Sequence, residues 1–264
     1  MPNSTFIIPL KIDSDIRLKN ITTSLKYILK HTDSNIIITE ADEYQKLFLD
    51  ELSDSRVTYF FKKSLPTEFH RTLIINEMLS NVKTDITINY DADIILPIEA
   101  FKTAEQLILN EQCDLVYPYG FEQFDQRKIF VGSESYEIFK DTLNLSDLKP
   151  EHIMVGFCRF GHVQFFKTKS YIDGFMENEN YRHWCPEDEE RGIRFQKLGY
   201  KVVWFRSAVF HQEHPPSTLL PLINRNEIYE LHERLINFNK EDLVAYYSNQ
   251  EYIKKYKKAY NDYS

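Results

Sequence analysis

The chain is poor in cysteine and has no excess of positive charge, and each shortage excludes a class of protein. Its three cysteines, Cys113, Cys158 and Cys185, are widely spaced and form no CxxC pair. This argues against a disulfide framework or a zinc knuckle and suits a reducing cytoplasm. The formal net charge of −8 argues against a dedicated nucleic-acid binder. We therefore expect a cytoplasmic protein with no nucleic-acid partner.

Long hydrophobic segments are also missing. The N-terminal sequence MPNSTFIIPLKIDSD has no basic region followed by a long apolar run, so we expect no signal peptide. Nowhere does an apolar stretch approach about 18 residues, so we expect no transmembrane helix. A hydrophobic content of 42% and a length of 264 residues suit one large soluble α/β domain, alone or with a helical tail.

The chain alternates between strand and helix patterns. The expected strands are residues 5–10, 35–42, 56–62, 85–91, 162–168 and 201–207. The expected helices are residues 18–29, 43–52, 66–82 and 186–199, with loops and short helices over 122–161 and a helical tail from about 217. Such alternation predicts βαβ units and a mostly parallel sheet, in which ligands bind at the carboxyl ends of the strands.

Two carboxylates interrupt the apolar stretch ITINYDADIILP at residues 86–97. Asp91 and Asp93 follow a strand pattern and are flanked by isoleucines, where a charge needs stabilisation. Such a pair at a strand end suits a hard divalent cation that also binds phosphate oxygens. Because aspartate also favours turns, the pair by itself fits a simple turn equally well.

Two histidines lie in the later segment FHQEHPP, residues 210–216. His211 and His214 come after the strand expected at 201–207 and could supply two imidazoles to one metal ion. Together with the carboxylate of Asp93 they form a mixed ligand set that suits Mn²⁺ or a related ion. Taken alone, the same pattern also fits two unconnected loop histidines.

A third acidic segment, HWCPEDEERGIRFQKLGY at residues 183–200, has the composition of an ordinary helix. Pro186 suits the first helical position, the four acids at 187–190 suit the first turn, and Gly199 suits the end. Two features fit this interpretation less well. Cys185 is a poor helix cap, and Trp184 places an aromatic face beside a carboxylate, as in sites where a general base acts on a bound sugar.

The order of these motifs resembles the inverting GT-A glycosyltransferases, and is most similar to β-1,4-galactosyltransferase-like enzymes and bacterial family 2 capsule and lipopolysaccharide enzymes. The resemblance covers roughly residues 4–120 and 160–216. It implies a GT-A fold, which is Rossmann-like α/β with a mostly parallel central sheet and flanking helices. The implied domain spans residues 1–216, with a donor half at about 1–120 and an acceptor and metal half at about 121–216. A C-terminal helical extension follows over 217–264.

The resemblance also implies an activity. It points to a metal-dependent enzyme, using Mn²⁺ or Mg²⁺, that moves a hexose or N-acetylhexosamine from a UDP-sugar to a glycan or lipid-linked saccharide. The processes implied are the synthesis of capsule, O-antigen or another surface polysaccharide. The chemistry needs no nucleophilic serine or cysteine, because a carboxylate can activate the acceptor hydroxyl for a single inverting displacement.

Individual roles follow only where this sequence matches the family motifs. The second aspartate of D-x-D binds the metal in these families, which implies Asp93 as a ligand, with His211 and His214, of which we favour His214. The general base implied by the family motif W-G-G-E-D-D-D is Asp188, with Glu187 before it, although Cys185 and Pro186 replace both glycines. The donor contacts implied are Pro9, Glu40 or Asp42 at the uracil, Arg71 at the diphosphate, Asn76 in support, Asp91 at the ribose or donor sugar, Asp93 and Trp184.

Two other functions share this fold. A sugar nucleotidyltransferase is expected to carry a glycine-rich phosphate loop after the first strand, and IIPLKIDSDIRLKN contains no glycine. A non-catalytic GT-A module would only bind a sugar or nucleotide. The C-terminal segment EYIKKYKKAYNDY has two possible roles. Its tyrosines at helical spacing, Tyr252, Tyr256 and Tyr260, either pack on the domain or lie with the lysines on the inner face of an anionic membrane.

Overall fold

The fold is built on a seven-stranded sheet with the order β10-β6-β9-β4-β1-β2-β3. The computed structural model describes residues 2–48, 53–65, 68–120, 125–155, 160–182, 186–215 and 225–263. Within it β9 runs antiparallel to β4 and β6, and the other neighbours are parallel. The strands are β1 (Ser4–Leu10), β2 (Asn35–Asp42), β3 (Val57–Lys63), β4 (Ile86–Tyr90), β6 (Leu115–Tyr117), β9 (Val163–Lys167) and β10 (Val202–Trp204). The expected α/β class with a mostly parallel sheet is confirmed.

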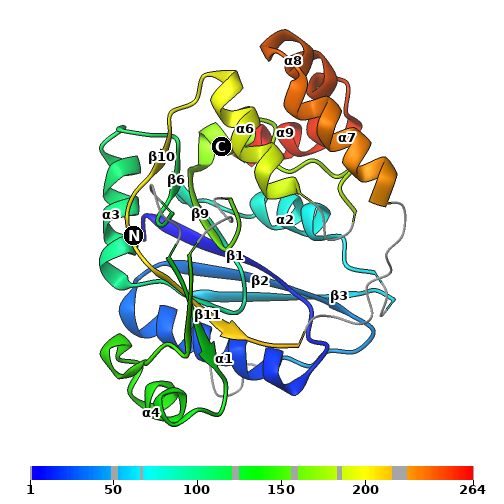
Figure 1. Ribbon diagram of the computed structural model, residues 1–264. Coiled ribbons are helices and arrows are strands. Elements are labelled where there is room, and N and C mark those ends of the chain that lie inside the picture. The colour runs from blue at the N-terminus through cyan, green and yellow to red at the C-terminus, as the bar shows by residue number, and fades with distance from the viewer. Residues whose placement is uncertain are drawn as a thin grey trace.

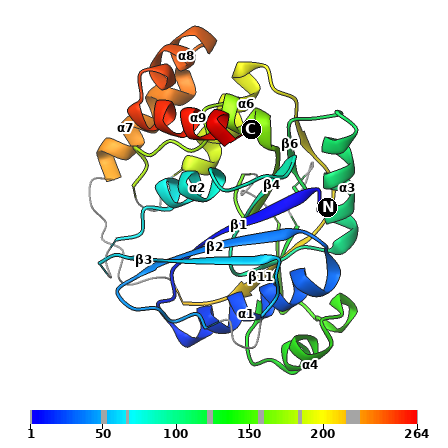
Figure 2. The same ribbon diagram turned by 180° about the vertical axis from the view of Figure 1, so that it is seen from behind.

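Helices flank this sheet, as Figures 1 and 2 show from opposite sides. They are α1 (Asp15–His31), α2 (Arg71–Leu79), α3 (Ile98–Leu109), α5 (Thr168–Asp173) and α6 (Glu187–Leu198). Strands β1 and β4 are buried at every residue, and in β4 this includes the polar side chains of Thr87 and Asn89. Helix α6 ends at Gly199, whose φ of 96° is left-handed, as the sequence predicts for a C-terminal glycine.

A second sheet brings together segments from the middle and the end of the chain. It has the order β5-β11-β7-β8, with β5 (Ile94–Ile95), β7 (Asp125–Phe130), β8 (His152–Val155) and β11 (Val209–Glu213). The expectation of loops and short helices over 122–161 is therefore incomplete. The segment does contain helix α4 (Glu134–Thr142), but β7 and β8 form because β7 pairs with β11, a partner about 80 residues away along the sequence.

Three other expectations need correction. Residues 43–48 are not helical, because Glu40 accepts the backbone N–H groups of Lys46 and Leu47 and folds this segment under the end of β2; residues 49–52 lie outside the described residues. Helix α2 begins only at Arg71, and residues 66–67 of the expected helix are also outside the described part. His211 and His214 do come after the strand expected at 201–207, which is β10, but a further strand, β11, was not expected, and His211 lies within it.

The C-terminal helices α7 (Arg225–Asn237), α8 (Lys240–Ser248) and α9 (Glu251–Tyr263) gather beside α6 in both views of the molecule (Figures 1 and 2). Tyr247 of α8 and Tyr256 of α9 belong to the same hydrophobic cluster as the central sheet. The hydroxyl of Tyr252 donates to Asn178 at 3.1 Å. These contacts favour the packing alternative for the tyrosine stripe, while Lys254, Lys255 and Lys258 are exposed. Among the described helices, none is long and apolar enough to cross a membrane.

Helix α6 is held in place by buried charges. Arg194 is 1% exposed and its Nε donates to Glu190 at 3.0 Å, while its Nη2 donates to the carbonyl of Met176 at 2.8 Å. The hydroxyl of Tyr247 donates to Glu190 at 2.7 Å. Glu187 and Glu190, two of the four acids at the start of α6, are buried. A role in stabilising the helix N-terminus would not require this burial.

Candidate active site

Asp93, His211 and His214 meet at the carboxyl end of the central sheet. Their ligand atoms all lie within 4.8 Å of one another, and among the described residues this is the group of three that could hold a metal ion. The antiparallel pairing of β5 with β11 sets His211 opposite Ile94, beside Asp93. His214 Nε2 lies 2.9 Å from Asp93 Oδ2, and His211 Nε2 lies 3.8 Å from Asp93 Oδ1.

Outer contacts orient both imidazoles. His211 Nδ1 lies 2.9 Å from Glu213 Oε1, which is itself 3.1 Å from Lys128 Nζ, and His214 Nδ1 lies 2.9 Å from the carbonyl of Pro215. The acceptors at Nδ1 fix the orientation of each ring, so that the other nitrogen, Nε2, faces Asp93 and is the one that could bind a metal ion shared with the carboxylate. One carboxylate and two such nitrogens form a donor set that fits Mn²⁺ or a related divalent ion.

The charge of Asp93 is stabilised from several sides. Burial opposes ionisation, but the hydrogen bond with His214 and the nearby His211 and Arg17 outweigh it and lower the pKa of Asp93 to about 2. Arg17 Nη1 lies 3.7 Å from Asp93 Oδ2. The hydrogen bond from His211, with the help of Lys128, lowers the pKa of Glu213 to about 2 as well. Both carboxyl groups are therefore ionised near neutral pH.

The other aspartate of the pair makes a different contact. Asp91 Oδ1 lies 2.7 Å from Arg71 Nη2, at the first residue of α2. Arg71 Nη1 in turn lies 3.4 Å from Glu187 Oε1 and 3.6 Å from Asp188 Oδ1, at the start of α6. The Asp91–Asp93 turn thus connects the candidate metal-binding group of Asp93, His211 and His214 (below, the metal-binding group) with the acid pair of Glu187 and Asp188.

The two acids of the pair have different surroundings. Glu187 is 7% exposed, and burial together with the neighbouring Asp188 raises its pKa to about 8 despite the nearby Arg71. The side chain of Asp188 is 26% exposed and accepts a hydrogen bond from Arg191 Nη2. Arg191 is completely buried and is fixed by Glu177 at 2.7 Å. Arg191 therefore holds Asp188 in position while leaving it accessible.

Glu40 and Asp42, the two residues predicted to contact the uracil, lie at the end of β2. Glu40 is fully buried, and its oxygens accept the backbone N–H groups of residues 46 and 47 and the hydroxyl of Tyr59 at 2.5 Å. Asp42 accepts the backbone N–H of Glu43 at 2.8 Å and ion-pairs with the half-exposed Lys46 at 2.7 Å. Glu40 is engaged by two backbone groups and a hydroxyl, whereas Asp42, although also buried, accepts one backbone N–H and otherwise pairs with Lys46 and Lys11, so Asp42 is the better candidate for a ligand.

Asn76 and Pro9 are internal. Asn76 is fully buried and exchanges hydrogen bonds with the backbone N–H and carbonyl of Glu177, at 2.9 and 3.1 Å. It therefore supports the carboxylate that fixes Arg191. Pro9 lies in β1 opposite Thr39 of β2. Trp184, the predicted aromatic contact, lies outside the described residues, as do His183 and Cys185.

Sequence reasoning missed Arg17, Glu213 and Arg191. Glu213 lies two residues after His211 on a strand, so both side chains are on the same face of β11. The spacing of two residues would have predicted this contact only if residues 209–213 had been recognised as a strand. Arg191 lies one turn after Asp188 on α6, and the i, i+3 spacing was a local signal for the contact.

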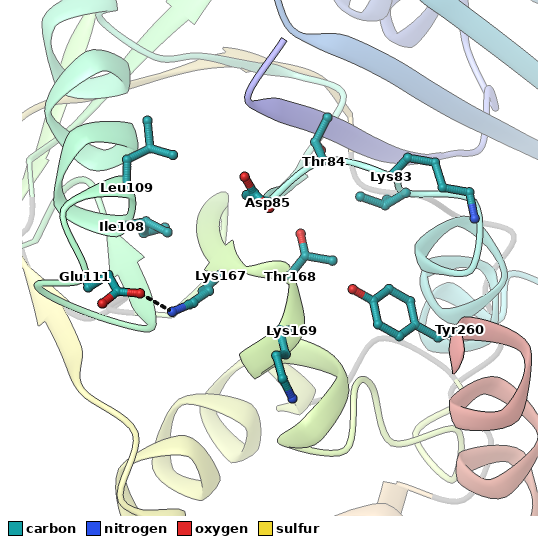
Figure 3. A pocket seen from close by; sticks show the side chains of 11 residues that line it. Lys83, Thr84, Asp85, Ile108, Leu109, Glu111, Lys167, Thr168, Lys169 and Tyr260 are labelled. Atoms are coloured by element: carbon teal, nitrogen blue, oxygen red, sulfur yellow. Dashed lines mark hydrogen bonds and ion pairs between the residues drawn. The ribbon is translucent and has the colours of Figure 1, made fainter. Parts of the chain in front are cut away.

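A separate cavity of about 690 Å³ lies away from these groups (Figure 3). Its wall includes Asp85, which precedes β4, whereas Asp91 follows that strand, so the cavity is at the opposite end of β4. Figure 3 shows the Lys167–Glu111 ion pair at its rim, with the two charged groups 3.2 Å apart. Lys169 is likewise paired, with Asp173 at 2.5 Å. The predicted site residues do not line this cavity.

Comparison with known proteins identifies the fold. No protein-family model and no curated protein sequence matches the chain. The structure is similar to S. aureus TarS, with a TM-score of 0.55 and 11% identity, over 91% of this chain and 41% of that one. It is also similar to TarS 1–349 in complex with UDP-GlcNAc (TM-score 0.57, 11% identity, 91% and 69% of the two chains) and with UDP (0.56, 12%, 91% and 68%).

These similarities confirm the fold that the motif order implies. The chain has a mixed α/β fold of the GT-A-like type. It spans less than half the length of the TarS chain first compared, and identities of 11–12% show the fold alone.

The environment of Glu187 predicts a pH dependence of stability. The folded protein keeps the Glu187 proton up to a pKa of about 8, while an unfolded chain releases it near ~4.3, so raising the pH between these values favours unfolding. The neutral Glu187→Gln variant lacks this term. We expect its unfolding free energy to exceed that of wild type increasingly from pH 5 to 8, by up to about 1.4 kcal/mol per pH unit. Urea titrations at several pH values measure this, and parallel curves would contradict the buried neutral acid.

Proposed function

We propose that the protein is a metal-dependent inverting glycosyltransferase that moves a hexose or N-acetylhexosamine from a UDP-sugar to a glycan or lipid-linked saccharide. The proposal rests mainly on the different partners of Asp91 and Asp93. Asp93 belongs to the metal-binding group, and Asp91 is linked through Arg71 to the acid pair. The fold and the binding of UDP-GlcNAc and UDP by the similar TarS structures support a UDP-sugar donor.

The donor side is assigned from charge. Asp93, His211 and His214 would hold Mn²⁺ or Mg²⁺, which when bound stabilises the negative charge of a departing nucleoside diphosphate. Arg71 lies between this group and the acid pair, and its guanidinium can bind phosphate oxygens with two parallel hydrogen bonds. Asp42 at the end of β2 is proposed as the uracil contact, in preference to Glu40.

The acceptor side is assigned from the difference between the two acids. Asp188, positioned by Arg191, takes the proton of the acceptor hydroxyl as that oxygen attacks the anomeric carbon. Glu187 is neutral below a pKa of about 8, so it adds no like charge beside the base. One displacement from the face opposite the leaving diphosphate inverts the anomeric centre. The proposed setting is the synthesis of capsule, O-antigen or another surface polysaccharide, by analogy with the resembled enzymes.

A donor panel tests the proposal as a whole. UDP-sugars with Mn²⁺ are screened by thermal shift, and the best donor is then assayed for UDP release with and without saccharide acceptors. We expect acceptor-dependent release that is lost with EDTA and in Asp93→Ala, because the charge on the leaving diphosphate is then uncompensated. Release that survives both treatments would contradict the metal centre, and donor binding with no acceptor-dependent release would favour a binding module.

The assignment of the base is tested separately. Asp188→Asn should lower kcat by about 10²–10⁴-fold with little change in the KM for the donor, because this acid faces the acceptor. Glu189→Gln is the matched control. It removes a charge from the same helical turn, but Glu189 contacts His232 at 3.3 Å and is 49% exposed. A near wild-type rate for Asp188→Asn, or a product with retained anomeric configuration, would rule out Asp188 as the base.

A further inference from the structure

Gln212 lies between the two histidines of the metal-binding group and faces the opposite side of β11, towards α1. Its backbone N–H donates to the carbonyl of Asp93 at 2.8 Å. Its side-chain Nε2 donates to Ser24 Oγ at 2.8 Å and to the carbonyl of Asn20 at 3.3 Å. The carbonyl of Gln212 accepts a hydrogen bond from Asn20 Nδ2 at 2.9 Å. This residue is therefore bonded both to α1 and to the D-x-D turn.

The same helix also holds the carboxylate segment. Ser24 Oγ donates to the carbonyl of Ile94 at 3.1 Å, one residue after Asp93. Asn20 and Ser24 are four residues apart, so they lie on one face of α1, and Figures 1 and 2 both show α1 beside β11. The three side chains, of Asn20, Ser24 and Gln212, are between 0% and 1% exposed. We refer to them below as the amide clamp.

Regular sheet pairing alone gives little control over this geometry. The contact between the two ligand-bearing segments is the pairing of β11 with β5, which is only two residues long, at Ile94 and Ile95. The longer pairing of β11 is with β7, which carries no member of the metal-binding group. A slip of β11 against the turn would break hydrogen bonds of the buried amide clamp, and such groups are costly to leave unpaired.

We propose that Gln212, with Asn20 and Ser24, is a positioning residue that sets the separation of the Asp93 carboxylate from the imidazoles of His211 and His214, and thereby the affinity for the divalent ion. This inference rests on the metal centre of the proposed function. The clamp touches neither the ion nor the donor. It acts by fixing the backbone on both sides of the ligand set.

The test measures Mn²⁺ affinity by electron paramagnetic resonance of the free ion, with and without UDP, alongside thermal unfolding. Gln212→Met keeps the length of the side chain and removes its hydrogen bonds, and we expect the Kd for Mn²⁺ to rise about 10–100-fold, as for other outer-shell changes. Asn178→Leu is the control. It also removes a buried amide, but one that bonds to Tyr247 and Tyr252 of the C-terminal helices. It should lower the unfolding temperature and leave the Kd unchanged.

Each outcome decides between explanations. If Gln212→Met binds Mn²⁺ as wild type does while Asp93→Ala does not, the positioning role is wrong and the metal centre stands. If Asp93→Ala itself binds Mn²⁺ as wild type does, the metal centre is wrong, and the proposed function with it. An equal loss of affinity in Gln212→Met and Asn178→Leu would reflect stability and overturn the inference. If Gln212→Met does not fold, Ser24→Ala serves instead, and an unchanged Kd in that variant overturns the inference.

Discussion

Two carboxylates separated by a single residue at the end of a buried strand repel each other. The arrangement of the rest of the site follows from how their charges are compensated. Asp91 and Asp93 receive their partners from opposite sides, Arg71 for the first and His214 with Arg17 for the second. If both relied on one partner, the turn would place two charges in one low-dielectric space. Separate compensation instead creates two adjacent sites that share a turn of three residues.

This constraint explains why the architecture needs two sheets. The cationic partner of Asp91 comes from α2, but the imidazoles near Asp93 belong to His211 of β11 and to His214 just after this strand. Strand β11 pairs with β5 and β7 outside the central sheet. The second sheet and the contacts from α1 deliver His211 and His214 to a point that the central sheet alone does not reach. On the other side, buried Arg191 performs the matching task for Asp188 on α6.

Local patterns in the sequence predicted the parts of the site that depend on neighbouring residues. The strand before Asp91, the acidic start of α6 and the central βαβ series all have short-range signatures, and they appear in the structure. The strands β7 and β11 were not predicted, because they form through pairing between segments that are distant in the sequence. Glu213 and Arg17 were missed for the same reason, since their roles arise only when β11 and α1 approach the turn. Residues 43–48 were mispredicted because the buried Glu40 recruits their backbone.

We propose that one divalent ion is bound between the D-x-D turn and the histidines of the β11 segment. The most direct measurement is the anomalous scattering of Mn²⁺ in crystals of the protein grown with UDP and Mn²⁺. We expect one strong anomalous peak at bonding distance from a carboxylate oxygen of Asp93 and from Nε2 of His214, with His211 on the same side and UDP phosphate oxygens completing the shell. A well-ordered UDP with no peak at Asp93, or an ion bound at Asp91 and Glu187 instead, would contradict it.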